Sequence, residues 1–165
     1  METSAFEKII QNSKASIYRI CKIYAVKPLE PQDLFQEVVL QVWKSYASFK
    51  GKSGVKTWIY RIALNVCMSS KLKLEKHRHQ SMKLTSIRIE AEQINEEEKA
   101  RFDALRACIN ELKEGERSLV VLYLEELSYA EISEILGITE NHVAVKMKRI
   151  RKKLFGCIIK KIENE

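Results

Sequence analysis

The chain has 165 residues, of which 45% are apolar and 31% are charged, so it is expected to fold as one domain or two small ones. With five glycines and two prolines it has few of the residues that make turns between strands, and the composition favours an all-α fold. The formal charge of +7 suits an anionic partner, either nucleic acid or membrane. The sequence shows neither an apolar run near the ~20 residues of a membrane span nor an N-terminal secretion signal, so we expect a cytoplasmic protein without membrane insertion.

The first half of the chain predicts three helices. Apolar residues recur at helical spacing over residues 4–25, and the two prolines of VKPLEPQD end that helix. Asp33 can begin a second helix. Seven of its apolar residues form two adjacent i, i+4 rows, typical of a core-facing helix: Leu34, Phe35, Val38, Val39, Val42, Trp43 and Tyr46. A third helix is expected from about Val55 to Leu72. The polar residues of the second helix fall mostly on its opposite face: Gln32, Asp33, Gln36, Glu37, Gln41 and Lys44.

The stretch FKGKSGVKTWIYRIALN, residues 49–65, opens as a short loop with two glycines and two lysines and continues into the third helix. It contains no acidic residue, and aromatic rings alternate with its cations. Stacking of a single-stranded base on an aromatic ring is worth roughly 1–3 kcal/mol, so this stretch is a candidate for contact with single-stranded nucleic acid. The alternative is that Trp43, Trp58 and the neighbouring rings belong to the hydrophobic core, as rings on apolar stripes usually do.

The middle of the chain predicts a linker. Residues 74–97 are polar and contain neither Gly nor Pro, and we expect them to become helical toward their end, where Glu96 to Glu98 suit a helix N-terminus. His77 and His79 have no Cys or Asp nearby, so they predict no metal site. The expected division is an N-terminal domain of residues 1–73, a linker of residues 74–97 and a C-terminal domain of residues 98–165.

The four cysteines are isolated in the sequence and lack the close pairing of metal sites and thiol redox motifs: Cys21, Cys67, Cys108 and Cys157. We therefore expect reduced thiols, as is usual for cytoplasmic proteins. The sequence also contains no evident nucleophile–base pair or phosphate-cradling loop, so we expect no enzymatic activity, no catalytic residue and no cofactor.

The segment LSYAEISEILGITENHVAVKMKRIRKKL carries the strongest motif in the chain. Ser128 followed by Glu131 forms a capping box that begins a helix, and Gly137 supplies the left-handed residue that ends it. Thr139 can cap a second helix, which becomes steadily more basic. This spacing predicts a helix-turn-helix, preceded by a buried helix that includes residues 119–124. The alternative is a basic helical hairpin without a role in DNA binding.

The second helix of this motif would enter the major groove of duplex DNA. Its first turns, from Glu140 to Lys148, would face base edges, whereas the later cations would neutralise phosphates and make binding sensitive to salt. Candidates for contact with the duplex are Thr139, Glu140, Asn141, His142, Ala144, Val145, Lys146, Lys148, Arg149 and Lys152. Arg151 and Lys153 are further candidates for phosphate contacts.

Two long segments resemble a known family. PQDLFQEVVLQVWKSYASFKGKSGVKTWIYRIALN is similar to region 2 of bacterial RNA polymerase sigma factors of the extracytoplasmic function group. LKEGERSLVVLYLEELSYAEISEILGITENHVAVKMKRIRKKL is similar to region 4 of the same group. The two resemblances occur in the right order and are separated by a linker of plausible length. They imply a minimal sigma factor of two helical domains that binds core RNA polymerase and directs transcription from promoters with −10 and −35 elements.

The resemblance also implies roles for individual residues. The N-terminal domain would dock on the clamp helices of the largest polymerase subunit through Asp33, Gln36, Glu37, Gln41 and Lys44. The loop and the third helix would capture a base flipped from the −10 element and hold the strand nearby, through Phe49, Lys50, Gly51, Lys52, Ser53, Lys56, Trp58, Arg61 and Asn65. The C-terminal domain would rest on the flap of the second-largest subunit and read the −35 element. Most members of this family have an anti-sigma partner, and we expect one here.

The recognition helix departs from the family pattern. Where many relatives have Lys or Arg, then Ser, then Arg, this chain has Ala144, Val145 and Lys146. The two apolar side chains can contact thymine methyl groups but cannot read guanine through two hydrogen bonds, so the −35 preference is expected to be unusual. Two other functions stay open. One is a helix-turn-helix regulator that binds duplex DNA without polymerase, and the other is an RNA-binding or nuclease-type enzyme, which fits the charge but lacks catalytic residues.

Overall fold

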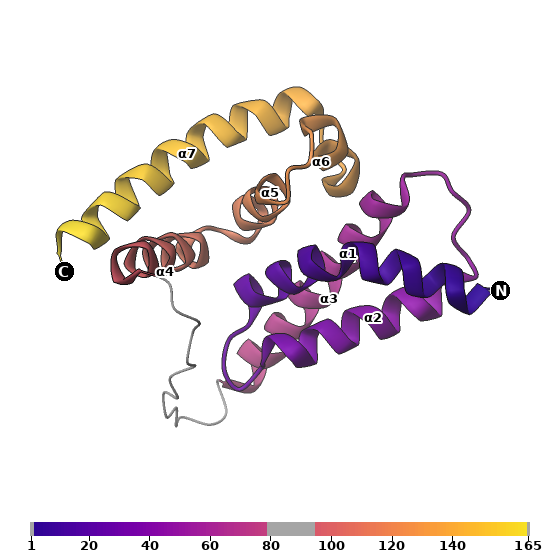
Figure 1. Ribbon diagram of the computed structural model, residues 1–165. Coiled ribbons are helices and arrows are strands. Elements are labelled where there is room, and N and C mark those ends of the chain that lie inside the picture. Colours follow the sequence, from indigo (N-terminus) through magenta and orange to yellow (C-terminus); the bar gives the residue numbers. More distant parts are fainter. Residues whose placement is uncertain (1, 79–94, 165) are drawn as a thin grey trace.

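The computed structural model describes residues 2–78 and 95–164, which form seven helices and no strand (Figure 1). The helices are α1 (Glu2–Tyr24), α2 (Pro31–Tyr46), α3 (Val55–Arg78), α4 (Glu96–Glu111), α5 (Glu114–Leu124), α6 (Tyr129–Leu136) and α7 (Glu140–Glu163). The expected all-α fold is confirmed over these residues. Most of the predicted linker, His79 included, lies outside the described residues.

The N-terminal half forms a three-helix bundle, in which α1, α2 and α3 each pack on the other two around buried residues such as Ile17 and Ile59. α2 begins at Pro31 and not at Asp33, because the fixed φ of proline and its missing N–H suit the first position of a helix. α3 continues past the expected end at Leu72. Its last turns are largely polar, so the apolar pattern fades before the helix ends.

The C-terminal half contains the helix-turn-helix that the sequence predicts. The backbone N–H of Glu131 donates to the Ser128 hydroxyl at 3.2 Å, and the N–H of Ser128 donates to the Glu131 carboxylate at 2.8 Å, which completes the capping box of α6. Gly137 ends α6 with a φ of 67°, in the left-handed region that favours glycine. The Thr139 hydroxyl accepts the N–H of His142 at 3.1 Å and begins α7.

The expectation of a fully buried helix around residues 119–124 is only partly right. Leu119 and Leu122 are buried in α5, but Tyr123 and Leu124 are 37% and 44% exposed. These two residues lie in the last turn of α5, where the helix reaches the surface before the chain enters the helix-turn-helix. Their apolar character in the sequence does not distinguish this surface position from a core position.

The expectation of four reduced thiols is wrong for one pair. Cys108 of α4 and Cys157 of α7 form a disulfide, with Cα atoms 6.0 Å apart and a sequence separation of 49 residues. A pair so far apart in the chain gives no local signal, and it comes together because α4 packs against α7. The other two cysteines, Cys21 and Cys67, are buried free thiols whose sulfur atoms lie 4.0 Å apart in the N-terminal bundle.

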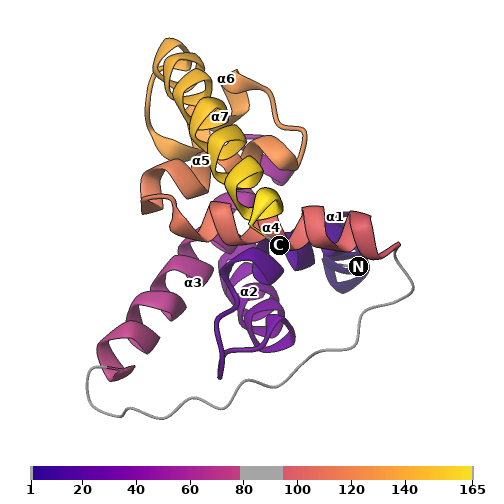
Figure 2. The ribbon, with the colours of Figure 1, turned by 90° about the vertical axis from the view of Figure 1, so that its left-hand side faces the viewer.

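The two halves of the chain touch each other. α3 packs on α6, and α1 packs on α4. Figure 2 shows α4 lying across the N-terminal bundle, with α5, α6 and α7 stacked on one side of it. Among the described residues, no helix combines the length and apolar character that crossing a membrane requires.

Candidate nucleic-acid interface

The loop before α3 places the rings of Phe49 and Trp58 against each other, in a tilted arrangement, beside exposed lysines. The ring of Phe49 lies 4.6 Å from that of Trp58, centre to centre, at an interplanar angle of 33°. Both rings are half-buried, whereas Lys50 and Lys52 are exposed. Gly51 has a φ of 65°, which places the turn of this loop in the region that favours glycine. The loop therefore combines an aromatic surface with positive charge at its edge.

The ring of Tyr60 belongs to the core, where it is only 1% exposed. The core alternative therefore holds for Tyr60, while the half-buried Trp58 keeps part of its ring at the surface. Lys56 lies above the ring of Tyr60, with its Nζ 5.7 Å from the ring centre, and it is itself exposed. Arg61 is half-buried and donates from Nη2 to the backbone oxygen of Glu134 in α6, at 2.7 Å.

Asn65 lies two turns beyond Trp58 on the same side of α3 and is exposed. It opens into a groove of about 300 Å³ between α2 and α3. The residues that line this groove are Glu37, Gln41, Ile62, Asn65, Val66, Ser69, Ser70 and Lys73. The structure thus brings Asn65 together with two residues of the predicted polymerase-docking set, Glu37 and Gln41. Asn65 does not lie in the Phe49 loop itself but farther along α3.

The outward face of α2 carries apolar side chains among the predicted polar ones. Asp33, Gln36 and Lys44 are exposed there. Leu40 and Trp43, which are 44% and 48% exposed, lie between them along the helix. The ring of Trp43 packs against that of Phe6 in an edge-to-face arrangement, with the ring centres 4.8 Å apart. Sequence reasoning missed Leu40, although its position outside both apolar rows of this helix could have indicated that it faces outward.

α7 has one buried and one exposed side over its first half. Val143, Met147 and Ile150 are buried in the C-terminal core. The opposite side is exposed and consists of Asn141, Val145, Lys148, Arg149 and Lys152. Of the other predicted contacts, Glu140 and His142 are exposed, Ala144 and Lys146 are half-buried, and the hydroxyl of Thr139 is engaged as the helix cap.

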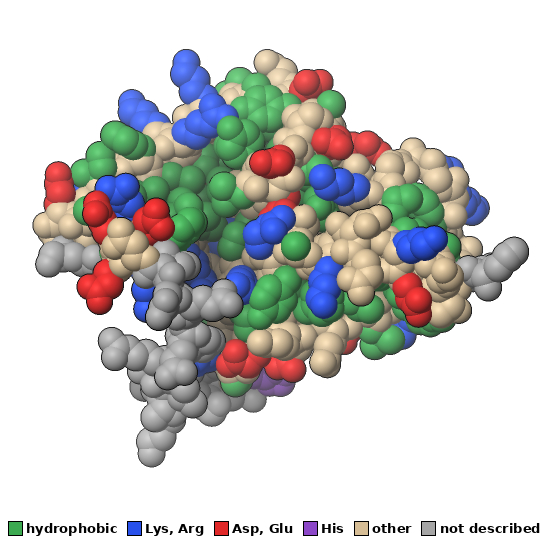
Figure 3. Space-filling view, viewed as in Figure 1, with side chains coloured by type: hydrophobic (Ala, Val, Ile, Leu, Met, Phe, Trp, Pro, Cys, Tyr) green, Lys and Arg blue, Asp and Glu red, His purple; other side chains and the backbone are tan. Residues whose placement is uncertain are grey.

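Two side chains that were predicted to contact phosphates already have partners within the C-terminal half. Arg151 donates to the Tyr123 hydroxyl at 2.7 Å and lies over the Tyr123 ring. Lys153 pairs with Glu116 at 2.6 Å, and this lysine is the main reason that the pKa of Glu116 falls below its usual range. Within the described part of the chain the structure shows no such ion pair for Lys148, Arg149 and Lys152. Figure 3 shows Lys and Arg side chains projecting along the upper edge of the molecule, over α7.

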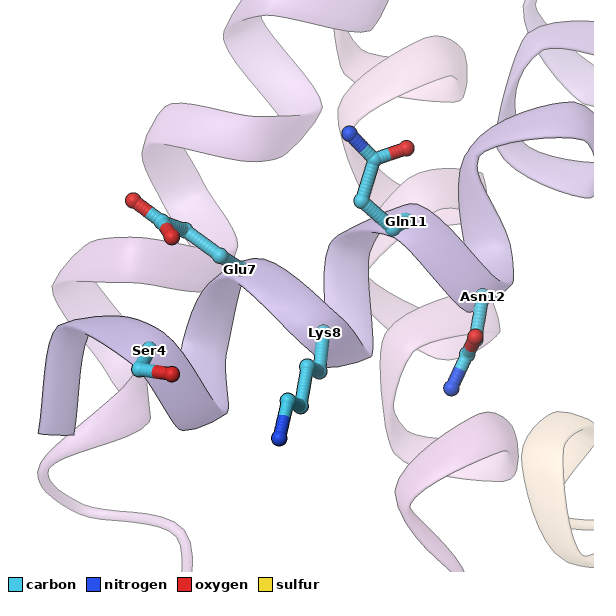
Figure 4. Close-up of a pocket in the computed structure, with 5 residues that line it drawn as sticks. All are labelled: Ser4, Glu7, Lys8, Gln11 and Asn12. Atoms are coloured by element: carbon cyan, nitrogen blue, oxygen red, sulfur yellow. The ribbon is translucent and has the colours of Figure 1, made fainter. Parts of the chain in front are cut away.

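A shallow hollow beside the start of α1 carries no comparable arrangement (Figure 4). Its lining residues come from this one helix: Ser4, Glu7, Lys8, Gln11 and Asn12. Their side chains project in different directions and do not converge on a common point. We assign no function to this hollow.

Comparison with known families matches both halves of the chain. The model described as Sigma-70 region 2 matches residues 9–77, and the model described as Sigma-70, region 4 matches residues 102–154. Region 2 precedes region 4 in the chain, as the Phe49 loop precedes the helix-turn-helix. The chain belongs to the sigma-70 family. Region 2 of this sigma factor therefore comprises α1 to α3, and region 4 contains the helix-turn-helix.

Several curated sigma factors are similar in sequence. RNA polymerase sigma factor YlaC of Bacillus subtilis is 28% identical over 139 residues, which cover 81% of this chain and 80% of YlaC. ECF RNA polymerase sigma factor SigW of the same species is 26% identical, over 93% of this chain and 88% of SigW. ECF RNA polymerase sigma factor SigG of Mycobacterium tuberculosis is 46% identical over 41 residues, but this segment spans only 11% of SigG.

Two solved structures share the fold over 93% of the chain. Sigma factor RpoE of Bartonella quintana, in complex with the anti-sigma factor NepR, matches with a TM-score of 0.76 at 19% identity and covers 93% of this chain. CnrH, in complex with the cytosolic domain of CnrY, matches with a TM-score of 0.66 at 17% identity. The match covers 96% of the RpoE chain and 87% of the CnrH chain. At these identities the likeness shows the fold alone.

Proposed function

We propose that this chain binds core RNA polymerase and directs it to a particular class of promoters, as a sigma factor of the extracytoplasmic function type. The observation that carries the proposal is that one chain, matched by the sigma-70 region 2 and region 4 models, presents two different surfaces for DNA. The first is the ring pair of Phe49 and Trp58 beside two lysines, and the second is the exposed basic side of α7. The proposal assigns no chemistry to the chain itself, and its place of action is the cytoplasm.

The outward face of α2 is the proposed docking surface for the polymerase. Protein interfaces combine an apolar centre, rich in aromatic residues, with a polar rim. Leu40 and Trp43 supply such a centre, and Asp33, Gln36 and Lys44 supply the rim. Glu37 and Gln41 extend the same surface to the groove between α2 and α3. We propose that the clamp helices of the largest subunit pack here, and that region 4 rests on the flap of the second-largest subunit.

The Phe49 loop and α3 form the proposed contact with the −10 element. Extruding a base from a duplex costs a few kcal/mol, which stacking on an aromatic ring can offset. The rings of Phe49 and Trp58 supply the stacking surface, and exposed Lys50, Lys52 and Lys56 supply charge for the strand phosphates. Gly51 and Ser53 shape the loop, and we assign Arg61 and Asn65 to the strand along α3.

The exposed side of α7 is the proposed reader of the −35 element. Val145 and Ala144 can meet thymine methyl groups, and Asn141 can read adenine through two hydrogen bonds. Lys148, Arg149 and Lys152 are placed to neutralise phosphates and set the register. One solved relative is in complex with the anti-sigma factor NepR, and the other is in complex with the cytosolic domain of CnrY. We propose that this chain likewise has an anti-sigma partner.

A second candidate is a conventional helix-turn-helix regulator that binds duplex DNA without polymerase. The helix-turn-helix would serve that function equally well. Such a protein would have no use for an exposed Leu40 and Trp43 beside a lysine-rich aromatic loop, and this combination favours the sigma factor.

In vitro transcription tests the proposal. The purified chain is added to core RNA polymerase and a library of promoter fragments, and the 5′ ends of the transcripts are mapped. We expect initiation at a restricted set of sites that share −10 and −35 sequences, and none with core polymerase alone. Tight binding to duplex DNA without any initiation would favour the regulator instead.

A further inference from the structure

The Cys108–Cys157 disulfide can be reached from the surface of region 4. Cys157 of α7 is half-buried, whereas Cys108 of α4 is only 1% exposed. Both cysteines line a hollow of about 330 Å³ where α4, the start of α5 and α7 meet. The other residues that line this hollow are Glu111, Leu112, Lys113, Glu116, Lys153 and Leu154. A thiol compound can therefore approach the sulfur of Cys157, whereas that of Cys108 is covered.

The two free cysteines form a protected pair in region 2. The sulfur atoms of Cys21 and Cys67 lie 4.0 Å apart, and both residues are fully buried. A hydrogen bond from the Cys67 thiol to Cys21 and burial both raise the pKa of Cys67. Since the thiolate is the reactive form of cysteine, this pair lacks both access and reactivity. It serves as an internal control for the pair in region 4.

The Cys108–Cys157 disulfide is unusual for a protein that acts in the cytoplasm, which is the proposed place of action of this chain. Cytoplasmic thiols are kept reduced, and a disulfide there is usually transient, with a catalytic or redox-sensing role. The proposed function assigns no chemistry to the chain, so redox sensing is the role that fits this bond. The inference rests on the proposed function for this compartment.

The second half of α7 depends on the disulfide for its attachment to α4. None of the described residues after Ile150 is buried. Two ion pairs join this half to the rest of region 4, Lys153 with Glu116 and Lys161 with Glu111. Such surface pairs contribute little to stability. The disulfide is the covalent link between the two helices.

Gly156 weakens the helix beside the bond. Glycine has the lowest helix propensity after proline, and Gly156 immediately precedes Cys157. An added Cβ at Gly156 would meet no atom within 4 Å, so packing does not require glycine at this position. A short helical segment without tertiary packing is marginally stable in water. Without the disulfide, residues 151–163 are therefore expected to unfold locally, whereas residues 140–150 stay anchored in the core.

We infer that Cys108 and Cys157 form a thiol–disulfide exchange site for a dithiol reductant, and that the redox state of this pair decides whether the second half of α7 stays folded on α4. The site is a property of region 4 alone. It can be measured without polymerase or promoter.

Reduction begins when a thiolate of the reductant attacks the Cys157 sulfur. The bond to Cys108 breaks, and Cys108 leaves as a thiolate and takes up a proton. The second thiol of the reductant then attacks the mixed disulfide, so that Cys157 leaves and is protonated. The reductant becomes a disulfide, and two electrons pass to the cysteine pair. The carboxylate of Glu111 lies 3.7 Å from the Cys157 sulfur and is placed to accept the proton of the reduced thiol.

The exchange has a consequence for the proposed −35 contact. Lys152, a proposed phosphate contact, is exposed and lies one turn before Gly156, in the segment that reduction releases. Asn141 and Val145 lie in the anchored half. Reduction should therefore remove one phosphate contact and leave the reading of bases unchanged.

Mass spectrometry of the full chain tests the exchange site. Glutathione, a single-thiol probe, should form a mixed disulfide on Cys157 and none on Cys108, Cys21 or Cys67. Dithiothreitol should then remove the hydrogen-exchange protection of residues 151–163 and leave that of residues 140–150, α5 and α6 unchanged. Gly156→Ala should retain more protection after reduction, because alanine favours the helix and fits without a clash.

Three results would overturn the inference. An adduct on Cys108 or on the region 2 pair would contradict the assigned site of attack. Unchanged protection of residues 151–163 would show that the bond does not control this half of α7. Loss of protection throughout region 4 would show that the bond holds the whole domain and is no local switch. The double variant Cys108→Ser with Cys157→Ser should behave as the reduced chain with or without dithiothreitol.

Fluorescence anisotropy with a mixed-sequence duplex at several salt concentrations tests the consequence for DNA. One lost phosphate contact should make the slope of log affinity against log salt less steep by about 0.9 on reduction. Oxidised Lys152→Ala should show the same slope as the reduced unmodified chain, with no further change on reduction. Equal slopes in the two redox states of the unmodified chain would overturn the effect on DNA. Failure of the chain to direct transcription would remove the proposed function and leave the mass-spectrometric result standing.

Discussion

Val145 lies exposed in the middle of the outward side of α7, 43% accessible and flanked along the helix by Asn141, Lys148 and Arg149. A branched apolar side chain at this place can favour the methyl group of thymine but offers no hydrogen bond to any base edge. The neighbouring Lys148 and Arg149 carry positive charge, which can attract the phosphates of any DNA sequence equally. At the scale of single residues, the proposed −35 contact therefore assigns base choice and general affinity to different side chains.

Replacing Val145 by arginine should move the −35 preference from thymine toward guanine at one position. A two-pronged arginine–guanine contact discriminates by about 1–3 kcal/mol, roughly a factor of 5 to 150 in relative affinity. Sequencing of −35 regions selected from a randomised library by polymerase with each variant measures the shift. Lys152→Ala is the matched control, and it should weaken all sequences alike. A preference that does not move with Val145→Arg would place the base contacts elsewhere on α7.

At the scale of helices, the two halves of α7 are held to the rest of the molecule by different interactions. Its first half is held by buried Val143, Met147 and Ile150, but no residue beyond Ile150 is buried. The second half is tied to α4 by the Cys108–Cys157 disulfide and by the ion pair of Lys161 with Glu111, at 2.7 Å. An exposed ion pair contributes little, so the disulfide is the stronger of these two ties.

Reduction of the Cys108–Cys157 disulfide should lower the free energy of unfolding of region 4 by about 2–4 kcal/mol, because the bond closes a long loop in the unfolded chain. Chemical denaturation with and without a thiol reductant measures the difference. Cys157→Ser should show the lower stability in both conditions and no response to the reductant. A response that persists in Cys157→Ser would show that the effect does not come from this bond.

At the scale of the whole molecule, the proposed surfaces for polymerase and for DNA are separate. The proposed polymerase face of α2 is exposed at Leu40 and Trp43, whereas Arg61 of α3 is in contact with region 4. Phe49 lies in the loop between these two helices, and Leu40 lies on the outer face of α2. Substitutions at the two positions should therefore have different consequences.

Leu40→Asp should abolish most binding to core polymerase, since it places a charge in the apolar centre of the docking surface. Phe49→Ala should leave that binding within about twofold and reduce promoter opening, because the stacking surface is lost. Co-elution with core polymerase measures the first property, and permanganate reactivity of promoter thymines measures the second. Equal loss of polymerase binding in both variants would make Phe49 a structural residue and contradict its assignment to the −10 strand.

The helices, their caps and the helix-turn-helix follow from local rules that can be read along the chain. Ser128, Glu131, Gly137 and Thr139 act on neighbours a few positions away, so their roles are visible without a fold. One apolar row of α2 likewise predicts its buried side, Leu34, Val38 and Val42, whereas the expectation of a core position is wrong for Trp43 of the second row, which is 48% exposed. The fold class and the two-region organisation could therefore be predicted from the sequence.

Other properties depend on which distant helices meet. The disulfide, the use of Arg151 and Lys153 within region 4, and the neighbours of Asn65 all arise from contacts between separate elements. The partner of Arg61 is a backbone oxygen 73 positions away, and no residue type marks such a group in a sequence. Periodicity and capping depend only on residues a few positions away in the sequence. Whether a Lys or Arg side chain already has a partner depends instead on which distant residues pack against it. The amino-acid order thus specifies what each helix can present, and the packing of helices selects which of those groups remain available to polymerase and DNA.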